Sequence, residues 1–114
     1  MKQIDQLSIN ELSDIANNMY GNLVKAAVDI ENKILVIDVE MHADAEQFLL
    51  EKGSKQENIW GINLYPNNFG TDKFVEFDSL INIRPSQKNM SRNVENEIIR
   101  KLILILIKEK IINE

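Results

Sequence analysis

The sequence predicts an α+β domain whose antiparallel sheet of about four strands follows the order αββαββα, with the helices mainly on one face. Three observations support this class: capping-box patterns that begin helices, adjacent segments with alternating apolar residues, and a long apolar stretch near the C-terminus. Antiparallel hairpins separated by helices are typical of a sheet with helices packed on one side. We expect residues 1–114 to form a single domain.

The first predicted helix begins at the capping box of Ser8 and Glu11, in which each side chain accepts a hydrogen bond from the backbone of the other residue. Gly21 provides the stop after the last turn. The apolar residues of this segment share one helical face: Leu7, Leu12, Ile15, Ala16 and Met19.

Residues 23–30 and 33–40 are predicted to be two strands joined by a loop at Glu31-Asn32. The register that a two-residue loop imposes places an opposite-charge pair, Lys25 and Asp38, on one face. On the other face it pairs apolar residues: Val28 with Leu35, Ala26 with Ile37, and Val24 with Val39. One register that produces an apolar face and a charge match together supports a hairpin, although Glu-Asn is weaker turn chemistry than Asn-Gly.

A second helix is predicted to follow Asp44, which forms another capping-box pattern with Gln47, and to end at Gly53. Its inward-facing residues are Ala45, Phe48 and Leu49.

Two further extended segments complete the predicted sheet. Residues 59–65 form a strand that ends at the turn cluster 66–70, and residues 73–84 form a long extended segment that Pro85 stops. Twelve residues is long for one strand, so we expect a bend or bulge near Asp78-Ser79. The core-facing residues are Trp60, Ile62 and Leu64 in the first segment and Val75, Phe77, Ile81 and Ile83 in the second.

The last helix, predicted over residues 94–112, carries more apolar residues than packing on one sheet requires. A wide apolar face holds Val94, Ile98, Ile99, Leu102, Ile103, Ile105, Leu106 and Ile112, and a second stripe holds Leu104, Ile107 and Ile111. The second stripe is covered either by another helix of the same chain or by a second copy in a homodimer through this C-terminal helix.

Composition limits the classes of function. Hydrophobic residues make up 44% and charged residues 27% of the chain, which is typical of a folded domain rather than a disordered one. The net charge of −5 disfavours binding to nucleic acid and to anionic membranes. The absence of cysteine excludes disulfides and cysteine nucleophiles, and a single histidine excludes a multi-histidine metal site. With no apolar leader and no apolar run of membrane-spanning length, we expect a cytoplasmic protein without membrane contact.

The alternation that buries apolar residues places polar side chains on the other face of the sheet. Acid, base and amide groups converge there, and we take six as candidate binding residues: Glu40, His42, Asn63, Asp78, Asn82 and Arg84. The simpler interpretation is a solvated sheet face with local charge pairs, in which Asp44 is only a helix cap. Asparagine, as at Asn63 and Asn82, and tyrosine, as at Tyr65, are unusual choices for a strand surface that has no function, so the cluster favours a binding site.

Two chemistries are open at this cluster. Glu40 and His42 lie two residues apart and would share a face on a continued strand, so with Asp78 or Asp44 they would bind a divalent metal. Arg84 would then hold a carboxylate or phosphate. Alternatively, His42 oriented by a carboxylate would act as a general base without a metal.

The loop before the last helix contains a weaker candidate for anion binding, formed by Lys88 and Arg92 next to the helix N-terminus. The favoured alternative is a solvated loop in which Ser91 or Asn93 caps the helix, because no glycine-rich cradle is present.

Three segments carry a recognisable pattern: Glu40–Asp44, Trp60–Pro66 with the sequence WGINLYP, and Phe77–Pro85 with the sequence FDSLINIRP. Together with Ser54-Lys55-Gln56 before the second segment and Ser91-Arg92 after the third, they resemble a prokaryotic family of small proteins known only as a domain of unknown function. The resemblance covers nearly the whole chain and implies a compact cytoplasmic protein. The resemblance implies no particular activity, fold or cofactor.

Three function classes follow from these observations. The favoured one is a ligand-binding or regulatory module whose polar face and basic loop hold a small anionic ligand or a protein partner. The second is a small hydrolase-like enzyme that uses His42 with carboxylates, with or without a metal. The third is an acidic interaction or inhibitor protein that covers a basic partner.

Overall fold

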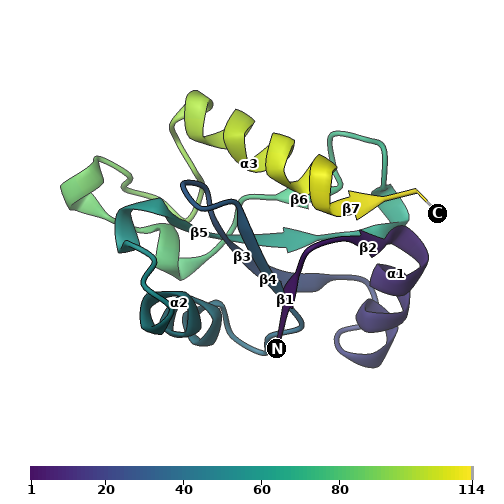
Figure 1. Ribbon diagram of the computed structural model, residues 1–114. Helices are drawn as coiled ribbons and strands as arrows, with labels where there is room; N and C mark the ends of the chain where they lie inside the picture. The colour runs from purple at the N-terminus through teal and green to yellow at the C-terminus, as the bar shows by residue number, and fades with distance from the viewer. Residues whose placement is uncertain (114) are drawn as a thin grey trace.

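The structure is a computed structural model that describes residues 1–113, and it contains a five-stranded antiparallel sheet with the strand order β1-β4-β3-β5-β6 (Figure 1). A small parallel sheet joins β2 to β7. The strands are β1 (Lys2–Ile4), β2 (Leu7–Ser8), β3 (Val24–Asp29), β4 (Ile34–Ile37), β5 (Ile59–Leu64), β6 (Val75–Glu76) and β7 (Ile111–Ile112). The helices are α1 (Ile9–Asn18), α2 (His42–Glu51) and α3 (Glu97–Lys110), with short 3₁₀ turns η1 (Gln56–Asn58), η2 (Pro66–Asn68), η3 (Leu80–Asn82) and η4 (Pro85–Gln87). The predicted α+β class with an antiparallel sheet is confirmed, whereas the strand count and order differ.

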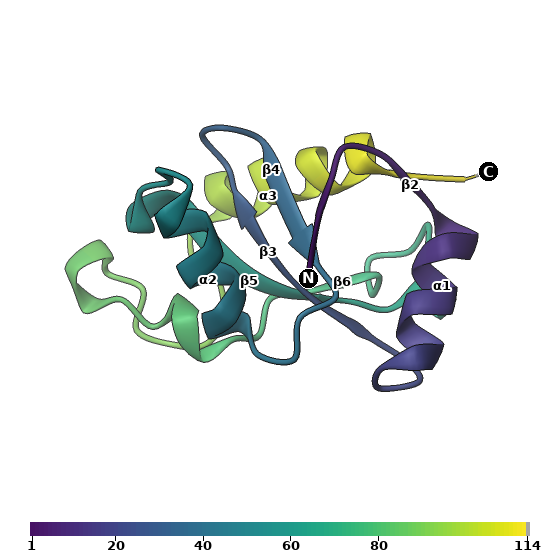
Figure 2. The same cartoon turned by 60° about the horizontal axis from the view of Figure 1, so that its bottom comes forward.

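Helices cover both faces of the large sheet. Figure 1 shows α3 above the sheet and α2 below it, and Figure 2 shows α1 at the end of the sheet away from α2. The α3 side contains the larger apolar cluster, in which Trp60, Ile62 and Leu64 pack as predicted. The α2 side contains a smaller cluster formed by Ala27, Val36, Val39, Ala45, Leu49 and Ile59. The polar face predicted for the sheet is therefore only partly open.

The β3–β4 hairpin has the predicted register, with Ala26 opposite Ile37 and Val28 opposite Leu35. The last ladder pair at the turn is Asp29 with Ile34, so the loop spans Ile30–Lys33 and is longer than expected. The Asp29 carboxylate holds this loop, because it accepts hydrogen bonds from the backbone N–H groups of Glu31 and Asn32 at 2.9 and 3.1 Å.

The predicted pair of Lys25 and Asp38 is wrong. β4 ends at Ile37, and Asp38 leaves the strand with a positive φ of 61°. The Lys25 ammonium instead lies 5.0 Å from the centre of the Tyr20 ring.

The capping box of Ser8 and Glu11 is confirmed at the start of α1. The second capping box is wrong, because α2 begins two residues before Asp44, at His42, and its N-cap residue Met41 makes no side-chain hydrogen bond. This shift changes the site, since His42 lies on a helix and not on a continuation of β4.

The prediction of one long extended segment over residues 73–84 is also wrong, except around β6. β6 contains only Val75 and Glu76, and the chain then turns into η3 and η4. The break lies near Asp78-Ser79, where a bend was expected. Beyond it, side chains rather than a strand bind the edge of β5, as the contacts of Asn82 and Arg84 below show.

The last helix buries only part of the predicted wide face, together with part of the second stripe. Ile103, Leu106 and Ile107 of α3 and Ile111 of β7 are buried. The outward residues are Ile98, Leu102, Leu104 and Ile105. The helix starts after Asn96, whose side chain accepts hydrogen bonds from the backbone of Ile98 and Ile99, so neither Ser91 nor Asn93 is the cap. Among residues 1–113, no helix has the length and apolarity needed to cross a membrane.

Candidate functional site

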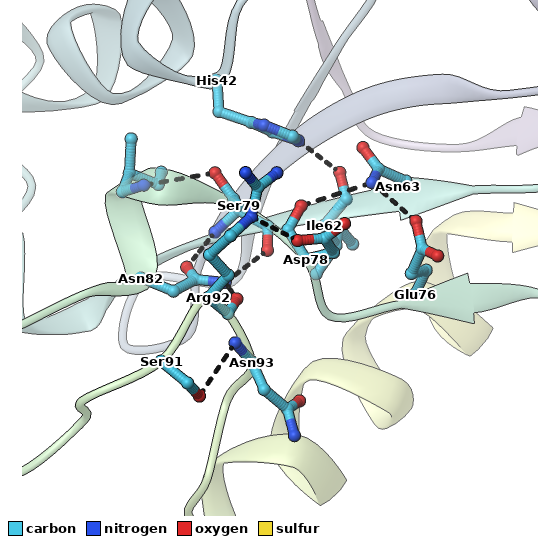
Figure 3. Close-up of polar contacts among 12 residues, drawn as sticks. His42, Ile62, Asn63, Glu76, Asp78, Ser79, Asn82, Ser91, Arg92 and Asn93 are labelled. Atoms are coloured by element: carbon cyan, nitrogen blue, oxygen red, sulfur yellow. Dashed lines mark hydrogen bonds and ion pairs between the residues drawn. The ribbon is translucent and has the colours of Figure 1, made fainter.

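Three polar residues occupy one register position across three neighbouring strands, on the sheet face that α2 partly covers. Lys25 of β3 lies opposite Asn63 of β5, and Asn63 lies opposite Glu76 of β6. A common register and face bring the three side chains side by side, and we call them the polar row. With His42, Tyr65 and Asp78 around it, the polar row forms what we call the His42 site, of which Figure 3 shows His42, Asn63, Glu76 and Asp78.

His42 is the first residue of α2 and lies over the polar row. Its Nε2 donates a hydrogen bond to the carbonyl oxygen of Ile62 at 2.9 Å, so the neutral ring carries its lone pair on Nδ1. Burial lowers the pKa of His42 below its ordinary value, and the charge of Lys25 acts in the same direction. The Ile62 carbonyl, Asn63 and Asp78 oppose this shift without reversing it. His42 is therefore a neutral group at neutral pH, as its place at a helix N-terminus also favours.

Asn63 is the most buried member of the polar row, with 7% of its surface exposed. Its amide nitrogen donates to Glu76 Oε1 at 2.9 Å and to the carbonyl oxygen of Asp78 at 3.3 Å. These two acceptors fix the orientation of the amide, because the flipped form would place its oxygen against two other oxygens. The side-chain oxygen, Oδ1, is buried and has no hydrogen-bond partner among the described residues. It lies close enough to His42 to favour protonation of the ring, but not in hydrogen-bond geometry.

Acidic groups form the outer part of the site. Glu76 Oε1 also accepts a hydrogen bond from the Tyr65 hydroxyl at 3.0 Å. Partial burial, and then the hydrogen bond and charge of Glu76, raise the pKa of Tyr65, so its hydroxyl remains a donor. Asp78 pairs with Arg92, with 2.6 Å between Oδ1 and Nε, and the pair is substantially exposed (Figure 3).

Asn82, one of the six candidates, binds the backbone at the edge of β5. Its Oδ1 accepts from the Gly61 N–H at 2.8 Å, and its Nδ2 donates to the Gly61 carbonyl at 2.9 Å and to the Arg92 carbonyl at 3.0 Å. The side chain is completely buried. Asn82 thus replaces the strand that would otherwise pair with Gly61, and all of its hydrogen-bonding groups are used within the fold.

Arg84 is likewise occupied by the fold. Its guanidinium lies over the Trp60 ring, 4.4 Å from the ring centre, and donates to the backbone carbonyls of Ile59, Gln56 and Ile81. Burial lowers the pKa of Arg84, and Glu46 opposes this. The cation is held by carbonyl oxygens and an aromatic face, which leaves it no free fork for an anion.

The remaining candidates do not converge on one centre. Glu40 is exposed before α2, and its backbone carbonyl accepts from the Tyr20 hydroxyl at 2.7 Å. Within residues 1–113, no group of three or more His, Asp and Glu side chains is placed to hold a metal ion, so the hypothesis of a metal at Glu40, His42 and Asp78 has no support. Lys88 is exposed at the end of η4, while Arg92 binds Asp78.

Sequence reasoning set aside or omitted three members of this site: Lys25, Tyr65 and Glu76. Lys25 was assigned to a pair with Asp38. Alternation predicts Tyr65 and Glu76 on the same polar face as Asn63, and the structure pairs Asn63 with Glu76, but neither Tyr65 nor Glu76 was taken as a candidate binding residue.

Comparison with known proteins identifies a family but no activity. A protein-family model described as "Protein of unknown function (DUF5674)" matches residues 3–110. No curated protein and no solved structure matches the chain. A function for these residues therefore depends on the geometry of the site itself.

Proposed function

The chain belongs to the DUF5674 family of proteins of unknown function, and we propose that it is a ligand-binding module whose ligand occupies the His42 site. The observation that supports this is the buried, unpartnered side-chain oxygen of Asn63. A buried acceptor without a donor costs about 1–3 kcal/mol, and folded proteins rarely retain one without a reason. A ligand that donates a hydrogen bond to this oxygen would remove that cost.

The chemical class of the ligand follows from the groups around that oxygen. His42 offers a lone pair on Nδ1, Asn63 offers Oδ1, and Glu76 offers a carboxylate. The cation of the polar row, Lys25, has its ammonium 5.0 Å from the centre of the Tyr20 ring, so the groups left for a ligand are acceptors, and we propose a small ligand with an N–H donor, namely an amine or an amide. The anionic ligand expected from the sequence has less support at this site, because Arg84 is held by carbonyl groups and Arg92 by Asp78.

Binding has more support than hydrolysis. A histidine that serves as a general base needs a nucleophile or a water within hydrogen-bond distance and a group that orients the ring. Here the group that orients the ring is the Ile62 carbonyl, which accepts a hydrogen bond from Nε2. Among residues 1–113, no set of three or more His, Asp and Glu side chains is placed to hold a metal ion. The carboxylate that the hydrolase hypothesis requires beside the ring is thus replaced by a backbone carbonyl, which favours a binding role.

An NMR titration of ¹⁵N-labelled protein tests the proposal. We expect butylamine and butyramide to shift the signals of His42 and the Asn63 side-chain amide, while butyrate, which has no donor, leaves them unchanged. Glu76→Gln removes an exposed charge from the site and is expected to weaken butylamine binding about threefold or more, which corresponds to roughly 0.7 kcal/mol. Glu57→Gln, at an exposed position in η1, is the matched control. Equal binding by wild type and both variants, or binding of butyrate alone, would contradict the proposal.

We also propose two features that the sequence suggested and that remain untested. The first is a homodimer through α3. Because Ile107 and Ile111 of the predicted second stripe are buried within the chain, this proposal rests instead on the exposed stripe of Ile98, Leu102 and Ile105, of which Ile98 is 70% exposed. Light scattering on a sizing column tests it: Ile98→Glu should shift a dimer to a monomer, and a wild-type monomer at high concentration would rule the dimer out. The second is a cytoplasmic location, which rests on the composition alone.

A further inference from the structure

A groove of about 680 Å³ lies between α3 and the segment from Phe69 to Phe77, on the opposite side of β6 from the His42 site. Strand alternation separates the two: Val75 and Phe77 line the groove, whereas Glu76 between them belongs to the polar row. The volume falls in the range of about 300–1,000 Å³ that is typical of small-molecule sites.

Buried apolar side chains form part of the groove lining. Phe74, Val75, Ile107 and Ile111 are each less than 10% exposed. The rings of Phe69 and Phe74 meet edge to face with their centres 5.2 Å apart, which holds both side chains in place. An apolar ligand would therefore enter a surface that is already formed.

The rim of the groove carries more positive than negative charge, in a chain whose net charge is −5. The cations are Arg100, Lys101 and Lys108, and the acidic residues are Asp72 and Glu97. Among residues 1–113, none of the three cations has a carboxylate within 4 Å. Arg100 is positioned by Phe77, whose ring centre lies 5.0 Å from its guanidinium carbon. Three unpaired cations beside an apolar surface are complementary to a ligand with an apolar body and an anionic group.

We propose that this groove is a second binding site, which takes a small monocarboxylate with an apolar body. The apolar body would lie against the phenylalanine rings and α3, and its carboxylate would accept hydrogen bonds from Arg100 and the neighbouring lysines. One negative charge fits better than two, because Asp72 and Glu97 share the rim and would repel a dianion. The acceptor-rich His42 site selects the opposite charge, so the two sites do not compete for one ligand.

Isothermal titration calorimetry with octanoate tests the apolar contact. Leu104→Glu places a charge in the groove at a position that is 45% exposed, so the change is tolerated by the fold. The matched control is Leu50→Glu, at a helical leucine of α2 that is 42% exposed and does not line the groove. We expect octanoate binding to weaken about tenfold or more in Leu104→Glu, which is roughly 1.4 kcal/mol, and to remain unchanged in Leu50→Glu. Equal binding by the two variants would overturn the proposal.

The charge requirement has its own test. Arg100→Gln is expected to weaken octanoate binding about threefold to tenfold while leaving the binding of 1-octanol unchanged, since the neutral alcohol has no charge to lose. Lys88→Gln, at an exposed cation outside the groove, should change neither. Wild-type protein that binds octanol as tightly as octanoate, or that binds neither, would refute a site for carboxylates. A dimer that covers the groove and excludes octanoate would refute it as well.

Discussion

Asn82→Ala tests whether the edge of β5 depends on one side chain. The substitution removes three hydrogen bonds from a residue with no exposed surface, and it leaves the N–H and the carbonyl of Gly61 without partners. Each buried backbone group left unpaired costs about 1–3 kcal/mol, so we expect a loss of roughly 2–6 kcal/mol. Because small domains unfold with about 5–15 kcal/mol, this is a large share of the total stability.

Urea unfolding measures this loss, with Trp60 as the reporter. Trp60 is the only tryptophan in the chain, is 1% exposed, and lies next to Gly61. Asn67→Ala, at an exposed asparagine, is the control and should change stability by less than about 0.5 kcal/mol. A loss below about 1 kcal/mol in Asn82→Ala, with an unchanged denaturant slope, would show that the amide does not hold this strand edge.

A second variant keeps the test informative if Asn82→Ala does not fold. Asn82→Asp retains the acceptor for the Gly61 N–H but loses both donors, and it places a carboxylate against two carbonyl oxygens. Those contacts raise the pKa of the new carboxyl in the folded state above its unfolded value. The stability of the variant is then highest below the unfolded pKa of about 3.9 and is lost as the pH rises through the folded pKa. A stability difference from wild type that stays constant from pH 4 to pH 7 would contradict this account.

Two further predictions concern the same region. Gly61→Ala should destabilise the protein by about 1–3 kcal/mol in urea unfolding, because its Cβ would lie 2.6 Å from the Cβ of Ser79. The double variant with Ser79→Gly should recover most of this loss, and a double variant without recovery would show that the clash with Ser79 is not the cause. For His42, whose folded pKa is below the ordinary value of 6.5, wild-type stability should fall as the pH decreases from 6.5 to the folded pKa, because the unfolded chain binds a proton that the folded chain does not. The slope of unfolding free energy against pH should not exceed about 1.4 kcal/mol per pH unit, and the contribution of His42 to it should be absent in His42→Gln. Equal slopes of unfolding free energy against pH in wild type and His42→Gln, measured between pH 7 and pH 5, would contradict this prediction.

The parts of the fold predicted correctly are those that depend on neighbouring residues. The capping box of Ser8 and Glu11 needs only a spacing of three, and the β3–β4 register follows from alternation on two adjacent segments. The same alternation predicted that Asn63 and Asp78 would lie on the polar side of the sheet, near His42. Part of the candidate site was therefore present in the local pattern.

The errors lie where a distant backbone decides the outcome. Residues 77–84 have the alternation of a strand, but the contacts of Asn82 and Arg84 with β5 turn the chain into 3₁₀ turns. A side chain that satisfies a backbone edge more than twenty residues away leaves no periodic signal. Asn89, which donates to the carbonyl of Asn82 at 2.7 Å, is buried for the same reason and was missed.

The sequence by itself determined the α+β class, the first helix cap, the hairpin register and the polar side of β5, because each depends on residue spacing along the chain. Only the tertiary structure decided that His42 begins a helix, that Asn82 and Arg84 serve the sheet edge, and that Ile107 and Ile111 face the core while Ile98 and Ile105 do not. A helix with apolar residues on several sides has no preferred face of its own. The packing of α3 against the sheet and the phenylalanine segment selects that face, and the same packing forms the groove.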